Sequence, residues 1–117
     1  MVSAAYVPAR GDVVWIDFDP QADHEQAGRR PALILSDKKY NARSSLVVLC
    51  PITSQQKPYP FVVALPPTLL PKASYVLADQ VKSLDWRQRN ATLIVKAPTN
   101  AVDEVTLFAV GIVQGRN

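Results

Sequence analysis

The sequence is poor in the residues that build disulfides and metal centres. Its 117 residues include one cysteine, Cys50, and one histidine, His24. A single cysteine excludes a disulfide within the chain and a multi-cysteine metal cluster, and it fits a reducing, cytoplasmic compartment. Cys50 stands in an apolar stretch, so we expect a buried and inert thiol. Bond cleavage by this chain is therefore expected to need no metal and no other cofactor.

Long apolar runs are missing as well. The first eight residues have no basic segment before an apolar run, which disfavours a signal peptide, and no run is long enough to span a bilayer. We therefore expect no membrane contact. The net charge is +3, a weak indication of an anionic partner. Hydrophobic residues make up 48% of the chain, enough for the core of a single domain over residues 1–117.

Glycine is scarce, with four residues, whereas proline is abundant, with ten. Because proline cannot continue a helix or donate to a β-ladder, this pattern predicts short extended segments separated by rigid turns. Residues 21–30 are polar and lack periodicity, which predicts a loop, and 37–45 are expected to hold about one helical turn. Strands are predicted where β-branched and apolar residues gather, at 12–18, 32–36, 46–50 (bounded by Pro51), 61–65, 75–82 and 91–95.

The end of the chain has a helical pattern instead. Apolar residues recur on one face from Val105 through Phe108 to Ile112, and we expect Asn100 to cap this helix and Gly115 to end it. Five or six short strands before one such helix predict a β-rich α+β fold. The expected architecture is a small, strongly bent antiparallel β-barrel with a C-terminal amphipathic helix.

The polar loop holds a carboxylate and a guanidinium around a glycine. Glu25 and Arg30 flank Gly28, and Pro31 restrains Arg30 to extended backbone angles. RNA cleavage by 2′-hydroxyl attack needs such a pair, because one group accepts the 2′-OH proton and the other stabilises charge on the pentacoordinate phosphorus. The alternative is a solvated loop with a weak ion pair, which composition alone favours.

Three further features allow a functional and a structural interpretation. The hydroxyls of Thr53 and Ser54 follow a buried strand, where they could bind a phosphate oxygen or satisfy their own backbone in a turn. The polar segments 79–83 and 85–89 could contact nucleic acid or form a strand edge and a surface turn. Aromatic residues such as Trp15 are more often core than base-stacking platforms, so we expect only one or two to face a ligand.

Together and in this order, these segments resemble the MazF/PemK-type toxins of bacterial toxin–antitoxin systems. The resemblance runs from about Tyr6 to Arg89 and is weaker in the last helix. The segments that carry it are Gly11–Pro20, His24–Ala32, Pro51–Ser54, Tyr59–Phe61 and Leu77–Ser83.

The resemblance implies an SH3-like barrel that acts as a homodimer. It implies a sequence-specific, metal-independent endoribonuclease that cuts single-stranded RNA, mostly mRNA, leaves a 2′,3′-cyclic phosphate and a 5′-hydroxyl, and thereby inhibits translation and growth. The implied partner is a MazE-like antitoxin whose extended, acidic C-terminal segment wraps the dimer and blocks the RNA groove. DNA would be reached only through that complex.

The resemblance also implies roles for individual residues. Arg30 and Thr53 correspond to essential family residues, and Glu25 to the loop glutamate, which would accept the 2′-OH proton alone or with His24. Residues implied in RNA binding are Trp15, Arg29, Ser54, Lys57, Asp79, Gln80 and Lys82.

The chain departs from the family pattern in three places. Arg29 stands at a position that varies among relatives, where a second cation in the loop would strengthen RNA binding instead of chemistry. Leu77 stands where one branch has an arginine, so that branch's arginine–aspartate pair is not carried over. The rigid Pro66–Pro71 segment resembles the variable loops that border the RNA groove, so the cut sequence cannot be borrowed from relatives.

Two rival functions stay open. CcdB-like toxins share the fold but bind DNA gyrase through an aromatic near the C-terminus, which residues 111–117 lack. A non-catalytic SH3-like module that binds RNA or a peptide would not require Glu25, Arg30 and Thr53 together.

Overall fold

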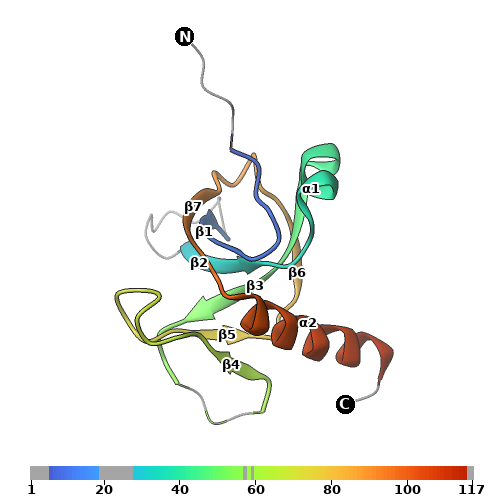
Figure 1. The fold of residues 1–117 in the computed structure, drawn as a ribbon. Coiled ribbons are helices and arrows are strands. Elements are labelled where there is room, and N and C mark those ends of the chain that lie inside the picture. Colours follow the sequence, from blue (N-terminus) through green and yellow to red (C-terminus); the bar gives the residue numbers. More distant parts are fainter. Residues whose placement is uncertain (1–5, 19–27, 57, 59, 116–117) are drawn as a thin grey trace.

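The expected β-rich α+β fold is confirmed by a computed structural model of the chain, which describes residues 6–18, 28–56, 58 and 60–115. An antiparallel, open, barrel-like sheet of seven strands carries two helices (Figure 1). The elements are β1 (Asp12–Asp17), β2 (Arg29–Ile34), α1 (Lys38–Ser44), β3 (Leu46–Thr53), β4 (Val62–Ala64), β5 (Tyr75–Leu77), β6 (Lys82–Asp85), β7 (Thr92–Lys96) and α2 (Thr99–Gln114).

Strand β3 connects the two halves of the sheet. It pairs with β6 along its first half, with β2 in its middle and with β5 at its end. The expected end of this strand at Pro51 is wrong, because β3 continues to Thr53. Pro51 lies opposite Ala32 of β2, and the next residue, Ile52, already pairs with β5. A proline is tolerated there because the strand changes neighbour at a residue that lacks an N–H to donate.

Strands β1, β2 and β3 are buried on both faces, which explains their continuous apolar runs. Val13 belongs to a core cluster shared with α2, whereas its neighbour Val14 belongs to a second cluster on the opposite face, around Trp86. Leu33 and Ile34 of β2 divide in the same way. Strands β1, β2 and β3 therefore contribute alternate side chains to two cores.

Helix α2 crosses the layer formed by β3, β5 and β4 (Figure 1). It buries Ala101, Val102, Val105 and Ala109, whereas Ile112, expected on the same face, is 39% exposed. The expected cap at Asn100 is also wrong. Pro98 ends the preceding extended segment with φ −67° and ψ 147°, so the helix already starts at Thr99 without a side-chain cap.

Three further boundaries differ from the sequence prediction. Arg29 and Arg30 belong to β2 instead of the loop. The segment expected as one strand over 75–82 is two strands, β5 and β6, because the chain turns between them and the backbone N–H of Gln80 donates to the carbonyl of Leu77 at 3.1 Å. The expected helical turn is the seven-residue α1, capped by the Asp37 carboxylate, which accepts from the Tyr40 N–H. Gly115 ends α2 in the left-handed region at φ 73°, as predicted.

Candidate active site

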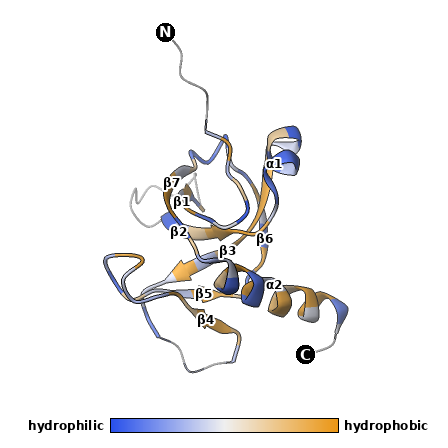
Figure 2. Cartoon of the chain, in the orientation of Figure 1, coloured by the Kyte–Doolittle hydropathy of each residue, from blue (hydrophilic) through white to orange (hydrophobic). Residues whose placement is uncertain are grey.

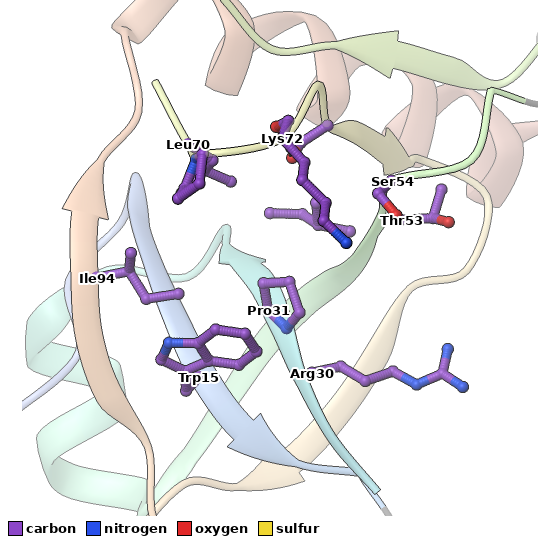
Figure 3. A pocket seen from close by; sticks show the side chains of 11 residues that line it. Trp15, Arg30, Pro31, Thr53, Ser54, Leu70, Lys72 and Ile94 are labelled. Atoms are coloured by element: carbon purple, nitrogen blue, oxygen red, sulfur yellow. Dashed lines mark hydrogen bonds between the residues drawn. The ribbon is translucent and has the colours of Figure 1, made fainter. Parts of the chain in front are cut away.

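A pocket of about 530 Å³ opens between the β1–β2–β7 side of the sheet and the β4–β5 connection. It brings together Trp15, Arg30, Thr53 and Ser54, four of the residues predicted for the site (Figure 3). The remaining lining residues are Pro31, Ile52, Leu70, Pro71, Lys72, Ser74 and Ile94.

Arg30 lies at the rim of this pocket on the second position of β2, opposite Ile16 of β1. Its side chain is exposed and extends along the side of the pocket where Thr53 lies, away from Trp15 (Figure 3). The following residue, Pro31, pairs with Trp15 and lines the pocket itself. The strand start therefore fixes the direction in which the Arg30 side chain leaves the backbone, in agreement with the restraint by Pro31.

Thr53 and Ser54 stand where β3 ends. The Thr53 hydroxyl accepts the backbone N–H of Gln55 at 3.1 Å, which is the local turn considered as the structural alternative. A hydroxyl that accepts one hydrogen bond still has its own proton to donate. The turn and a phosphate contact are thus compatible, because the turn holds the hydroxyl in place at the pocket.

Arg29 has a different environment from its neighbour. Its guanidinium lies 3.0 Å from the Asp17 carboxylate and also donates to the carbonyl of Asn90 at 3.0 Å and the hydroxyl of Thr92 at 3.1 Å. The Asn90 amide and Arg29 both contact Asp17, and together they hold the pKa of this carboxyl below its usual range, although partial burial opposes them. Arg29 as an RNA ligand stays a prediction, but its three protein partners favour a structural role.

Further contacts close the base of the β1–β2 connection. The backbone N–H of Phe18 donates to the carbonyl of Gly28 at 2.5 Å, and the Arg89 guanidinium donates to the carbonyls of Asp17 and Phe18. The two ends of the connection are therefore fixed to each other and to the turn before β7. His24 and Glu25, the predicted acid–base residues, lie outside the described residues, as do Lys57 and Tyr59.

Trp15 is the exposed aromatic of the site. It has 43% of its surface accessible and lines the pocket beside Ile94 of β7. Phe18 packs against a core cluster, and Phe61 contacts Phe108 edge to face with ring centroids 5.9 Å apart. Trp15 is thus the aromatic placed to face a ligand, and the expectation that one or two aromatics do so stays a prediction.

The predicted residues Asp79, Gln80 and Lys82 lie elsewhere. They are exposed in and after the β5–β6 turn, and they are not among the described residues that line the pocket.

Burial, reinforced by the negative charge of Asp79, raises the pKa of the Cys50 thiol to about 12. The expected burial of this thiol is confirmed, and such a pKa makes it a poor nucleophile.

Sequence reasoning missed the pocket residues Leu70, Lys72 and Ile94. Lys72 carries the one positive charge between Val62 and Tyr75, and a lone cation in a proline-rich loop was a usable signal. Ile94 gave none, because its direction depends on an irregularity in the β1–β7 pairing.

The described residues contain no group of three His, Cys, Asp or Glu side chains placed to hold a metal ion. Within the same part of the chain, neither helix is long and apolar enough to cross a membrane.

Comparison with known proteins defines the class to which this fold and pocket belong. The sequence model of the PemK-like, MazF-like toxins of type II toxin–antitoxin systems matches residues 9–107, so the chain belongs to this family. It is 46% identical over 103 residues, 88% of either chain, to the endoribonuclease toxin MazF of Escherichia coli K12. The endoribonuclease PemK of Escherichia coli is 30% identical over 82% of this chain and 74% of its own.

Solved structures agree with the sequence relatives. MazF from Deinococcus radiodurans superposes with a TM-score of 0.83 at 48% identity, covering 95% of this chain and 99% of the other. A chain of the MazE–MazF complex from the same organism gives 0.81 at 42% identity over 97% and 100%. The predicted family, its barrel fold and its class of endoribonuclease toxin are confirmed.

Proposed function

We propose that this protein is a sequence-specific, metal-independent endoribonuclease that cuts single-stranded RNA, mainly mRNA. One observation carries the proposal: a cation, two hydroxyls and an exposed aromatic ring line the same pocket. An RNA chain presents phosphates for Arg30, Thr53 and Ser54 and an unpaired base for Trp15. The family membership supports the same activity.

In the proposed reaction the 2′-oxygen attacks the adjacent phosphorus while the bond from phosphorus to the 5′-oxygen breaks. Glu25 accepts the 2′-OH proton, with or without His24, and a proton passes to the leaving 5′-oxygen from His24 or solvent. Arg30 stabilises the phosphorane and the charge on the leaving oxygen, and the Thr53 hydroxyl orients the phosphate. The products are a 2′,3′-cyclic phosphate and a 5′-hydroxyl, and the cell stops translating the cut messages.

The test is incubation of purified protein with mixed-sequence single-stranded RNA in excess EDTA, followed by mapping of the new ends. Cleavage at a short recurring sequence with cyclic phosphate ends supports the proposal. Intact RNA at every tested sequence would sink it, and inhibition of DNA gyrase would then favour the CcdB-like alternative. Binding of RNA or a peptide without cleavage would favour the non-catalytic module.

The proposed active form is a homodimer built through the C-terminal half of α2. This half is hydrophobic (Figure 2), and it exposes Leu107, Val110 and Val113. Val110 and Val113 also line a groove of about 350 Å³ between α2, Leu35, Val48 and Val81, with few polar groups in its walls. Soluble monomers seldom expose such a continuous apolar surface, whereas dimer interfaces are built from one.

The proposed partner is a MazE-like antitoxin with an acidic C-terminal segment, which would reach DNA as a complex. Relatives from Deinococcus radiodurans were solved as MazE–MazF complexes. An acidic segment across the pocket would place its carboxylates where Arg30 would otherwise meet phosphate, which explains inhibition by competition for one charge. Since mRNA is the substrate, we place the protein in the cytoplasm.

A further inference from the structure

The pocket has two chemically different ends, and the proposed reaction uses only one of them. Arg30, Thr53 and Ser54 form the polar end, which would receive the phosphate that is cut. Trp15, Ile94 and Leu70 form the other end, and their side chains are apolar (Figure 3). The volume of about 530 Å³ exceeds what one phosphate fills and lies within the range of about 300–1,000 Å³ found for ligand sites.

A β-bulge builds the apolar end. The register between β1 and β7 passes from Val13 opposite Val95 to Val14 opposite Leu93, so Ile94 is the extra residue of β7. A bulge turns its side chain out of the regular alternation and is frequent beside functional sites. Ile94 lines the pocket next to the exposed indole of Trp15 as a result.

The β4–β5 connection forms the opposite wall. Leu70 and Lys72 come from this one loop, and the Lys72 side chain reaches toward the space between Ser54 and Pro31 (Figure 3). Its ammonium group thus enters the pocket from the wall opposite β2, the strand that carries Arg30. Two cations on opposite sides of one pocket match a chain with a phosphate on either side of each base.

Resting on the proposed function, we propose that the apolar end is a subsite for one unpaired base next to the phosphate that is cut. The base stacks on the Trp15 indole and contacts Ile94 and Leu70, while Lys72 pairs with the neighbouring phosphate. Every base has a face that stacks on an aromatic ring, so the walls supplied by Leu70 and Ile94 decide which base fits. Leu70 and Ile94 are therefore determinants of the RNA sequence that is cut.

The first experiment measures tryptophan fluorescence during titration with the mapped RNA target, carrying 2′-deoxyribose at the cut position so that it cannot react. The chain has two tryptophans, and Trp86 is buried, at 5% exposure. We expect saturable quenching that disappears in Trp15→Phe, where Trp86 remains as an internal control. RNA binding seen by anisotropy without quenching of the wild type would overturn the subsite.

The second experiment replaces one nucleotide at a time by an abasic residue and measures steady-state cleavage. In the wild type one position next to the cut should raise KM about tenfold, the size of one lost stacking contact. In Trp15→Leu the same abasic substrate should cost nothing further. An equal abasic penalty in wild type and Trp15→Leu, or no sensitive position, contradicts the proposal.

Lys72→Ala tests the phosphate contact. It should raise KM about threefold to tenfold, leave kcat within about twofold and reduce the slope of log KM against log salt by about one. Lys39→Ala on α1 removes the same charge away from the pocket and should change neither. If KM and the salt slope of Lys72→Ala match those of Lys39→Ala, Lys72 does not contact a phosphate. A wild type that cuts RNA while these variants match it refutes the subsite alone, whereas an inactive wild type refutes the proposed function.

Discussion

The two hollows of the molecule differ in the chemistry of their walls. The pocket at the end of β3 has Arg30, Lys72 and the hydroxyls of Thr53, Ser54 and Ser74 beside apolar side chains. The surface of the groove beside α2 is mainly apolar, although Arg10, Ser36, Thr106 and Gln114 also line it. Strand β3 reaches both, with Val48 in the groove and Thr53 in the pocket, about 17 Å apart along the strand. The difference indicates a polyanion for the pocket and another apolar protein surface for the groove.

The largest effect should come from removing the Arg30 guanidinium from the pocket. Arg30→Ala should lower kcat by at least ~10²-fold, because it removes charge stabilisation from the transition state. The measurement is cleavage of the mapped RNA target in excess EDTA. Arg43→Ala, at the exposed end of α1, is the matched control and should keep full activity. Near-full activity of Arg30→Ala would show that another group stabilises the phosphorane.

The groove is tested by placing a charge in it. Val113→Asp should raise the dimer dissociation constant by at least ~10²-fold, because an unpaired carboxylate in an apolar contact costs several kcal/mol. Sedimentation over a range of concentrations gives the constant. Glu104→Lys changes the charge of an exposed residue outside the groove and should leave it unchanged. A Val113→Asp protein that dimerises like the wild type would remove the groove from the interface.

A hydroxyl at the end of β3 should matter less than the cation. Thr53→Val keeps the shape but removes the donor, and we expect kcat to fall about tenfold to a hundredfold. Thr53→Ser retains the hydroxyl and should recover most of the rate. If the kcat of Thr53→Ser falls as far as that of Thr53→Val, the loss comes from packing of the methyl group and not from the hydrogen bond.

The smallest effect is expected for Arg29. Its substitution tests whether this cation holds the fold together or binds an RNA phosphate. Arg29→Ala and Asp17→Asn should each lower kcat a few-fold. The double variant should lower kcat no further, because both substitutions break the same ion pair between Arg29 and Asp17. The salt dependence of KM should stay as in the wild type. A slope reduced by about one in Arg29→Ala alone would instead identify a phosphate ligand.

The same contact responds to acid. Because the folded protein holds the pKa of Asp17 below its ordinary value of 3.8, the contact stabilises the fold above that pH and is lost as pH falls through the lowered pKa. Urea unfolding between pH 2 and 7 should therefore show a smaller acid loss in Asp17→Asn than in the wild type. Identical acid limbs would mean that the pKa is not lowered.

Sequence reasoning predicted what depends on local pattern and missed what depends on pairing. The apolar runs predicted the existence of most strands, although not all of their bounds, and Gly115 predicted the end of α2, because burial and backbone freedom are properties of neighbouring residues. The continuation of β3 past Pro51 was missed, since a proline is tolerated only if the strand changes partner there. Ile94 was missed because a bulge exists only relative to β1.

The residues of the candidate site also divide into those that local sequence predicts and those that depend on contacts between distant segments. Arg30 and Thr53, which both line the pocket, could be singled out because their motifs are contiguous in the sequence and lie at strand ends. The contacts of Arg29 to Asp17, Asn90 and Thr92 could not be predicted, because these partners come from two other segments, and its role as an RNA ligand stays a prediction. Lys72 was overlooked for the same reason, because the β4–β5 loop meets the pocket only after the sheet has bent.

The shared strand β3 also has a consequence for how the protein unfolds. Its hydrogen bonds to β2, β5 and β6 join both sheet halves, and its side chains contribute to both cores. Neither half can open alone without exposing apolar surface of the other, which makes the domain one cooperative unit. The backbone amides of β3 should therefore exchange with solvent only through global unfolding, and pocket and groove should be lost at a single denaturant midpoint.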